Sequence, residues 1–148
     1  MPSWSSGSGT RREPRSVRER GSYQTLDIVR SAAAVLRASA RLSFRRRGES
    51  LPDLVSRLRD APRSGTTDPL LSLAVLERLL PLLPPYGTGR CVKRSLLLLD
   101  LWSRAGLDPE LHLGLAAGED RRGHAWITTR EGVLETYRPA DIVETYRA

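Results

Sequence analysis

Two side chains in this sequence have the chemistry of a nucleophile and its base: Cys91 and His124. Cys91 stands just after the turn YGTG, in the segment RCVKRSLLLLDLWSRA. This segment is apolar almost all round, and it predicts a buried, central helix over residues 90–105, with Gly89 before it and Gly106 after it. We therefore expect Cys91 in the first turn of that helix.

The start of a helix favours a reactive thiol for two physical reasons. Backbone N–H groups of the first turn have no partner within the helix, and the positive end of the helix dipole stabilises a thiolate. The same N–H groups can donate hydrogen bonds to an oxyanion that develops on an attacked carbonyl. Basic neighbours add positive potential: Arg90, Lys93 and Arg94. The competing interpretation is a small buried apolar residue, the usual role of a lone cysteine.

The chain after Gly106 changes from a helical to an alternating pattern. ELHLGLAA at 110–117 has leucine at alternate positions, GHAWITT at 123–129 is rich in β-forming residues, and a reversal at 130–132 leads to VLETY at 133–137. These patterns predict a small antiparallel sheet of at least three strands, packed on the cysteine-bearing helix.

His124, Trp126 and Thr128 share one face of their predicted strand. A sheet packed on the helix would bring His124 towards Cys91. A histidine at a strand start is, on its own, better explained as structural. A cysteine at a helix start reverses that preference, because a thiolate–imidazolium pair needs both groups. His112 points away from the leucines of its strand, so we expect it to be exposed and structural.

The first half of the chain predicts three helices that serve as scaffold. The ordered domain is expected to begin near Ser22, and the first helix includes residues 26–44. Pro52 suits the first turn of a second helix over 51–58, and Asp68 caps a third with Pro69 at its first position. The expected buried face of the first helix consists of Leu26, Val29, Ala33, Leu36, Ala40 and Phe44, and that of the third of Leu70, Leu73, Leu76, Leu79 and Leu80.

A stripe of arginines runs beside the apolar face of the first helix. It consists of Arg30, Arg37, Arg41 and Arg45. The pattern favours a solvated flank over a dedicated anion-binding strip. Taken together, the elements predict an α+β fold, with helices first and then a central, Cys91-bearing helix packed on a small antiparallel sheet.

Composition sets further bounds. The chain has 148 residues, enough for one domain, and a formal net charge of +7 that comes almost wholly from arginine. Its single cysteine excludes an internal disulfide and a Cys-rich metal cluster. With only two histidines besides, we expect no metal site, and the cysteine chemistry needs no cofactor.

Residues 1–21 are rich in Ser, Gly, Pro and Arg, so we expect a disordered basic tail before a domain over 22–148. No aromatic residues alternate with the arginines of the tail, and we expect no nucleic-acid partner. The start of the chain lacks a signal-peptide pattern, and Asp100 interrupts the longest leucine tract. We therefore expect no membrane association and a cytoplasmic location, where the thiol stays reduced.

These residues resemble those of a known family. GRCVKRSLLLLDLWSRAGLDPELHLGLAAG, followed by GHAWITTREGVLE, is similar to the transglutaminase-like leader peptidases of lasso-peptide biosynthesis, in their split, stand-alone form. The resemblance runs from about Leu73 to Tyr137. Its strongest matches are Cys91, residues 94–96, Gly106, Gly114 and residues 124–126. HAW alone is found in any transglutaminase-like domain.

The resemblance implies a transglutaminase-like (papain-like) cysteine protease fold. It also implies a Cys–His–acid peptidase that removes the leader from a ribosomally synthesised lasso-peptide precursor. We expect a separate leader-recognition protein as partner, because the chain has no room for such a domain before Ser22. A lasso cyclase similar to asparagine synthetase would close the ring, and is a further expected partner.

The family places the acidic residue of the triad just after the hairpin. Glu135 is the nearest candidate here, Asp141 is the alternative, and Thr136 stands where some relatives have the acid. If Arg130 and Glu131 form a two-residue turn, residue 137 lies opposite His124 in the hairpin. Glu135 is then one diagonal away on the same face of the sheet. A slip of one residue moves Glu135 to the other face.

Two other functions use the same residues. A transglutaminase-like acyltransferase would pass the acyl group to an amine instead of water. A non-catalytic peptide-binding module would keep the fold and lack the acid, an alternative that Thr136 keeps open.

Overall fold

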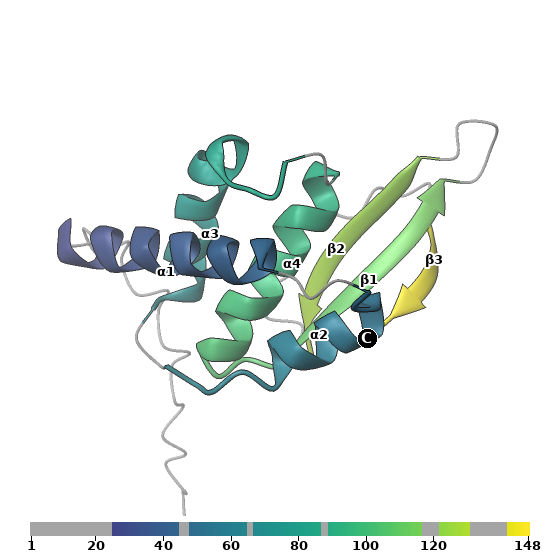
Figure 1. Ribbon diagram of the computed structural model, residues 1–148, viewed down its shortest axis with the longest axis horizontal. Coiled ribbons are helices and arrows are strands. Elements are labelled where there is room, and N and C mark those ends of the chain that lie inside the picture. Colours follow the sequence, from purple (N-terminus) through teal and green to yellow (C-terminus); the bar gives the residue numbers. More distant parts are fainter. Residues whose placement is uncertain (1–24, 45–47, 65–66, 87–88, 117–121, 131–141) are drawn as a thin grey trace, which may run out of the picture.

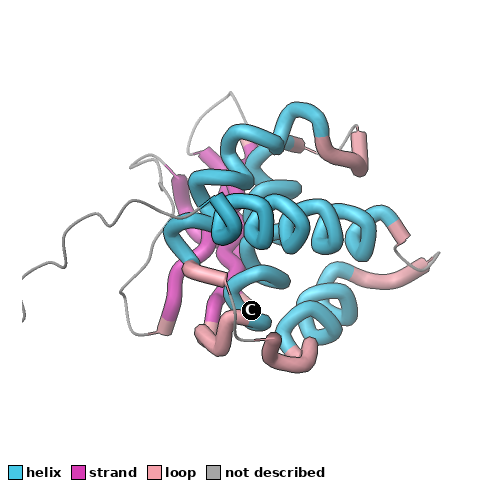
Figure 2. The backbone as a smooth tube through the Cα atoms, turned by 90° about the vertical axis from the view of Figure 1, so that its left-hand side faces the viewer, coloured by secondary structure: helices cyan, strands magenta, loops and turns pink. Residues whose placement is uncertain are grey.

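The fold is an α+β arrangement, as predicted. The computed structural model describes residues 25–44, 48–64, 67–86, 89–116, 122–130 and 142–148. Its elements are α1 (Thr25–Ser43), α2 (Leu51–Arg59), α3 (Pro69–Leu79), the short 3₁₀ helix η1 (Leu80–Leu82), α4 (Arg90–Arg104), β1 (Pro109–Ala116), β2 (Gly123–Thr129) and β3 (Ile142–Arg147). Figure 1 shows α4 beside β2, and in Figure 2 the three strands lie together as one group next to the helices. The predicted tail at 1–21 and the start of the domain lie outside the described residues.

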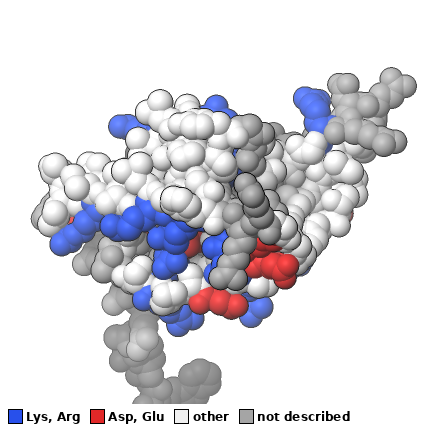
Figure 3. Space-filling model, viewed as in Figure 1, with Lys and Arg blue, Asp and Glu red and all other residues white. Residues whose placement is uncertain are grey.

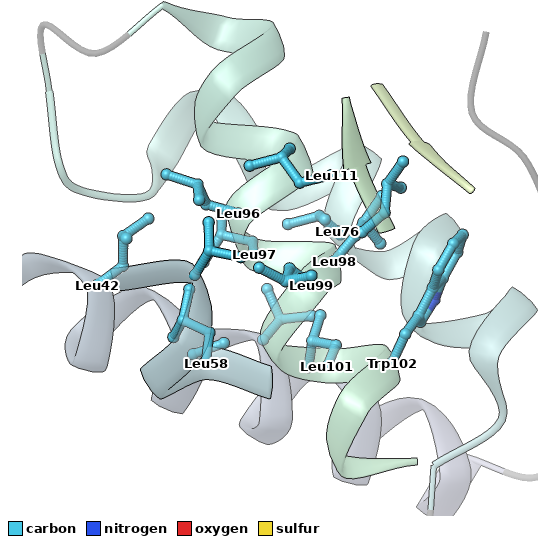
Figure 4. Packing of buried hydrophobic residues seen from close by; sticks show 14 of the residues in the cluster. Leu42, Leu58, Leu76, Leu96, Leu97, Leu98, Leu99, Leu101, Trp102 and Leu111 are labelled. Carbon is cyan, nitrogen blue, oxygen red and sulfur yellow. The ribbon is translucent and has the colours of Figure 1, made fainter. Parts of the chain in front are cut away.

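Helix α4 is the central element, as its sequence predicts. It packs against α1, α2, α3, β1 and β2, and every residue from Ser95 to Ser103 is buried. Figure 4 shows its leucines surrounded by Leu42 of α1, Leu58 of α2, Leu76 of α3 and Leu111 of β1. Burying apolar side chains on all sides removes them from water, and this contact with five elements fixes α4 in place.

Asp100 is a buried charge within this apolar helix. Its side chain is 2% exposed, and two guanidinium groups pair with it: Arg41 of α1 through Oδ2, and Arg104 through Oδ1 at 2.9 Å. A buried carboxylate is costly unless paired and hydrogen-bonded. The leucine tract therefore tolerates Asp100 because arginines from two helices neutralise it.

The buried face predicted for α1 is wrong. Leu26, Val29 and Leu36 are each more than half exposed, and Phe44 is 84% exposed. The residues of α1 that are buried are Ser31, Val35, Ala38, Ser39 and Leu42. A search for apolar residues misses this face because two of its buried residues are serines. The small side chains of serine and alanine let α1 pack closely on α3 and α4.

The cap predicted for α3 is confirmed, and α2 has a cap that was not predicted. Ser50 caps α2 by accepting a hydrogen bond from the Asp53 amide, and Asp68 accepts hydrogen bonds from the Leu70 and Leu71 amides at the start of α3. The buried face of α3 differs in part from the prediction, since Leu70 is 55% exposed and Leu71 is buried in its place, while Leu76 and Leu80 are buried as predicted.

The described sheet is antiparallel and has the order β2-β1-β3. The strands predicted at 110–117 and 123–129 are confirmed as β1 and β2. The strand predicted at 133–137 lies outside the described residues, and the third described strand, β3, pairs with β1 on the side away from β2. Figure 1 shows β1 between the other two strands.

No helix of the described residues is long and apolar enough to cross a membrane.

Candidate active site around Cys91 and His124

Cys91 lies in the first turn of α4 and is half-buried. Gly89 caps the helix with extended backbone, and its carbonyl accepts the first helical hydrogen bond from the Lys93 amide at 3.0 Å. The amides of residues 90–92 precede that bond, so they have no carbonyl to bond within the helix. Their N–H groups and the positive end of the helix dipole are therefore close to the Cys91 thiol.

Two hydrogen bonds hold the segment that leads into α4. Lys93 is buried, and its ammonium donates to the Leu83 carbonyl at 2.8 Å while lying 5.9 Å from the centre of the Tyr86 ring. The hydroxyl of Ser39 in α1 donates to the Pro84 carbonyl at 2.6 Å. Lys93 thus serves mainly to fix the chain before Cys91, and with it the start of the helix.

Cys91 opens into a hollow of about 410 Å³ that is lined by Glu77, Arg90, Cys91 and Arg94. Arg94 forms an ion pair with Glu77 of α3, which orients its guanidinium across the hollow. Arg90 is exposed, and no described carboxylate pairs with it. One positive charge therefore remains among the residues that line the hollow after the ion pair is counted.

His124 is the second residue of β2 and is half-buried. Its ring is stacked beside Trp126, with centroids 6.3 Å apart and planes at 17°. In Figure 1, α4 and β2 both begin in the upper part of the molecule. His124 is not among the residues that line the Cys91 hollow.

The two faces of the sheet differ. Leu111 and Ile127 belong to the same buried cluster as the α4 leucines. Side chains alternate along a strand, so His124, Trp126 and Thr128 share the other face, the one turned away from α4. The register places His112 opposite Trp126 on that face.

His112 is buried, and the prediction that it is exposed is wrong. Its ring is stacked on Trp126 with centroids 5.2 Å apart and planes at 9°. Its Nδ1 lies 2.9 Å from Oε1 of Glu144, and its Nε2 lies 2.8 Å from Oγ1 of Thr128. Strand β3 brings Glu144 to β1, and sequence reasoning did not anticipate that pairing. The alternation in IVETYR was the available signal for β3.

Gly114 lets the strands approach at this point. It pairs with His124 of β2 on one side and with Glu144 of β3 on the other, beside a register shift in β1. A Cβ at Gly114 would lie 2.6 Å from the Val143 carbonyl oxygen and 2.3 Å from Ile142 Cγ2. Only glycine permits this close approach.

Comparison with known protein families identifies the family to which this chain belongs. The family described as the transglutaminase-like superfamily matches residues 32–141, more than half of the chain. The chain belongs to the transglutaminase-like superfamily. No curated protein and no solved structure matches it. The match includes Cys91 and His124, and it extends the resemblance seen in the sequence back into α1. The predicted transglutaminase-like α+β fold is therefore confirmed at the level of this superfamily.

The two candidates for the third catalytic residue, Glu135 and Asp141, lie outside the described residues, as does Thr136. Glu144 is the described acid that contacts an imidazole, and that imidazole belongs to His112. Among the described residues, no three His, Cys, Asp or Glu side chains form a group that could hold a metal ion.

Proposed function

We propose that this transglutaminase-like protein is a cysteine peptidase that removes the leader from a ribosomally synthesised lasso-peptide precursor. Cys91 is the nucleophile, His124 the base, and Glu135 the acid that orients it. A separate leader-recognition protein delivers the precursor, and the lasso cyclase receives the product. The proposal includes a cytoplasmic location, because the thiol must stay reduced.

The observation that carries the proposal is the position of Cys91. It lies at the start of the most buried helix of the described chain and opens into a hollow with Arg90 and Arg94. A structural cysteine would be expected inside the leucine cluster, where it would gain most from burial. Membership of a superfamily that includes cysteine peptidases supports the same interpretation.

In the proposed reaction, His124 takes the proton of the Cys91 thiol and becomes an imidazolium. The thiolate sulfur bonds to the carbonyl carbon at the leader–core junction, and the carbonyl π electrons move to oxygen. Amides of the first turn of α4 donate hydrogen bonds to this oxyanion. When the oxyanion collapses, the C–N bond breaks, and the imidazolium protonates the leaving amine.

The thioester that remains is hydrolysed in the second half of the reaction. His124 removes a proton from water, and the hydroxide oxygen attacks the thioester carbonyl. Collapse of that intermediate breaks the C–S bond, releases the leader as a carboxylate, and restores Cys91. The carboxylate of Glu135 keeps the imidazole in the right tautomer and stabilises its charged form.

Dependence on a delivering partner fits the open shape of the Cys91 hollow. Four side chains line it, and three of them carry charge. Such a surface offers few apolar contacts, and a peptide held there alone would gain little binding energy. Leader binding by a second protein would supply that energy and raise the local concentration of the scissile bond.

The test is mass spectrometry of the precursor encoded beside this gene, incubated with the purified protein and its leader-recognition partner. Wild type, Cys91→Ala, His124→Ala and Glu135→Ala are compared, each checked for folding by thermal melting. One cut that disappears in Cys91→Ala and His124→Ala supports the proposal. Cleavage that persists in folded Cys91→Ala overturns it.

The same experiment separates the alternatives. An acyltransferase would join the leader acyl group to an added amine, such as hydroxylamine or a lysine peptide, in preference to water. A binding module would retain the precursor without any change in mass. Hydrolysis by wild type that depends on Cys91 excludes both.

A further inference from the structure

A second polar hollow lies at the end of α4, whereas Cys91 lies at the start of that helix. It has a volume of about 380 Å³ and lies between α1, the end of α4 and the loop that precedes α3. We call it the arginine pocket. Its lining residues are Ala34, Arg37, Arg41, Ser64, Thr67, Leu101, Arg104 and Ala105. Figure 3 shows basic side chains gathered along α1 on the face that the figure presents.

The charges around the arginine pocket do not cancel. Arg41 and Arg104 share one carboxylate, that of buried Asp100. Arg37 is exposed, and no described carboxylate pairs with it. Three guanidinium groups therefore face one carboxylate, and the pocket keeps a net positive charge. Arg37 and Arg41 are also four residues apart on one helix, a spacing at which like charges repel.

The arginines are not needed to satisfy the end of α4. The last carbonyls of that helix already accept backbone hydrogen bonds: Leu101 from Ala105, Trp102 from Leu107, Ser103 from Gly106, and Arg104 from Ser64, at 2.9–3.1 Å. Capping of a helix end by basic side chains is a common reason for arginines in such a place. Here that reason does not apply.

Two residues with hydroxyl groups, Ser64 and Thr67, line the loop side of the arginine pocket. A hydroxyl can donate a hydrogen bond to an anion, so these residues add neutral donors to the three guanidinium groups.

We propose that the arginine pocket binds a phosphoryl group, either as free pyrophosphate or as the diphosphate of a nucleotide. A phosphate group carries more than one negative charge and several acceptor oxygens, and the planar forks of arginine match its geometry. Binding relieves the repulsion between Arg37 and Arg41. This inference is independent of the peptidase proposal, because it uses neither Cys91 nor a precursor.

The experiment is isothermal titration calorimetry of the full chain in about 50 mM salt, where surface screening is moderate. The probes are pyrophosphate, ADP and citrate. The key variant is Arg37→Gln, which removes a positive charge that forms no ion pair with a described carboxylate. The matched control is Arg30→Gln, on the same helix and exposed, whose residue does not line the pocket. Thr67→Val removes a hydroxyl at unchanged charge.

We expect pyrophosphate to bind, with a Kd raised about tenfold by Arg37→Gln, as for loss of one charge-assisted contact. Arg30→Gln should leave the Kd within about twofold, and Thr67→Val should weaken binding without altering its salt dependence. If pyrophosphate binds as tightly as ADP, the free anion is sufficient for binding. If ADP binds more tightly, the ligand is a nucleotide.

Three results would overturn the inference. The first is that neither pyrophosphate nor ADP binds. The second is that Arg37→Gln and Arg30→Gln weaken binding equally, because equal weakening indicates diffuse attraction to a basic surface. Binding of citrate as tightly as pyrophosphate is the third, because it assigns the site to carboxylates. Binding measured in Cys91→Ala protein keeps the result separate from peptidase activity.

Discussion

The imidazole of His112 lies flat against the indole of Trp126, with ring centroids 5.2 Å apart and planes at 9°. The same indole stands beside His124, 6.3 Å away by ring centroids. Glu144 and Thr128 hold the two nitrogens of His112. The orientation of the candidate base is therefore linked, through Trp126, to a buried histidine on the neighbouring strand.

Trp126→Leu should lower both stability and activity, because it removes a ring that is 2% exposed and contacts both imidazoles. We expect a loss of about 3 kcal/mol in the free energy of unfolding, as for other large-to-small changes in a core. Trp126→Phe keeps an aromatic ring and should lose less than Trp126→Leu. Urea unfolding measures the stability of both variants, and precursor cleavage measures their activity. Equal stability of the leucine variant and wild type would show that the stack contributes nothing.

Thr128→Val tests the second partner of His112. The substitution keeps the shape of the side chain and leaves Nε2 of the buried imidazole without its partner at 2.8 Å. We expect a loss of about 1–2 kcal/mol in the free energy of unfolding. Thr145→Val is the matched control, since Thr145 is exposed and bonds only the Leu113 carbonyl at 3.2 Å. Similar losses in the two variants would argue against a special role for the His112 contact.

The helices and strands around Cys91 could be predicted because their signals are local. Asp68 with Pro69 marks the start of α3, and Gly89 and Gly106 frame α4, where Gly106 has a φ of 87° that suits glycine. The alternation of β1 and β2 likewise depends only on neighbouring residues. Caps, turn residues and periodicity act within a few positions, so one sequence is enough to identify them.

The parts that were predicted wrongly depend on contacts between distant segments. Nothing near His112 reveals that β3 will pair with β1 and bring Glu144 to it. On α1, an apolar stripe that includes Leu36 and Phe44 suggests burial, yet Val35 and Ser39 are buried instead. Periodicity identifies a face, but tertiary packing decides which face is covered.

Gly114→Ala should be strongly destabilising. Its Cβ would lie 2.6 Å from a backbone oxygen of β3, and backbone cannot move aside as a flexible side chain can. We expect a loss of about 2–4 kcal/mol from overpacking and weakened pairing of β1 with β3. Gly123→Ala is the control on β2, where a Cβ would meet only Leu115 at 3.9 Å. Thermal melting compares the two, and a Gly114→Ala protein as stable as Gly123→Ala contradicts the packing argument.

Arg41→Gln should destabilise the protein, whereas Arg37→Gln should not. Arg41 pairs with Asp100, whose side chain is 2% exposed, and its loss leaves that carboxylate with Arg104 alone. We expect a loss of about 2 kcal/mol for Arg41→Gln, less than for a wholly unpaired buried charge because Arg104 remains. A change within about 0.5 kcal/mol is expected for exposed Arg37. Urea unfolding of both variants also shows that Arg37→Gln is folded for the binding experiment.

Glu135→Gln and Glu144→Gln separate catalysis from support. If Glu135 orients His124, its amide variant should lower kcat about 100-fold or more with little change in stability, because an amide cannot stabilise the imidazolium. Glu144 contacts His112, so Glu144→Gln should change the free energy of unfolding more than kcat. Cleavage kinetics and urea unfolding of the same two proteins give both readouts. The reverse outcome, a large kcat loss in Glu144→Gln alone, would assign the acid to β3 and would place His112 in the catalytic machinery.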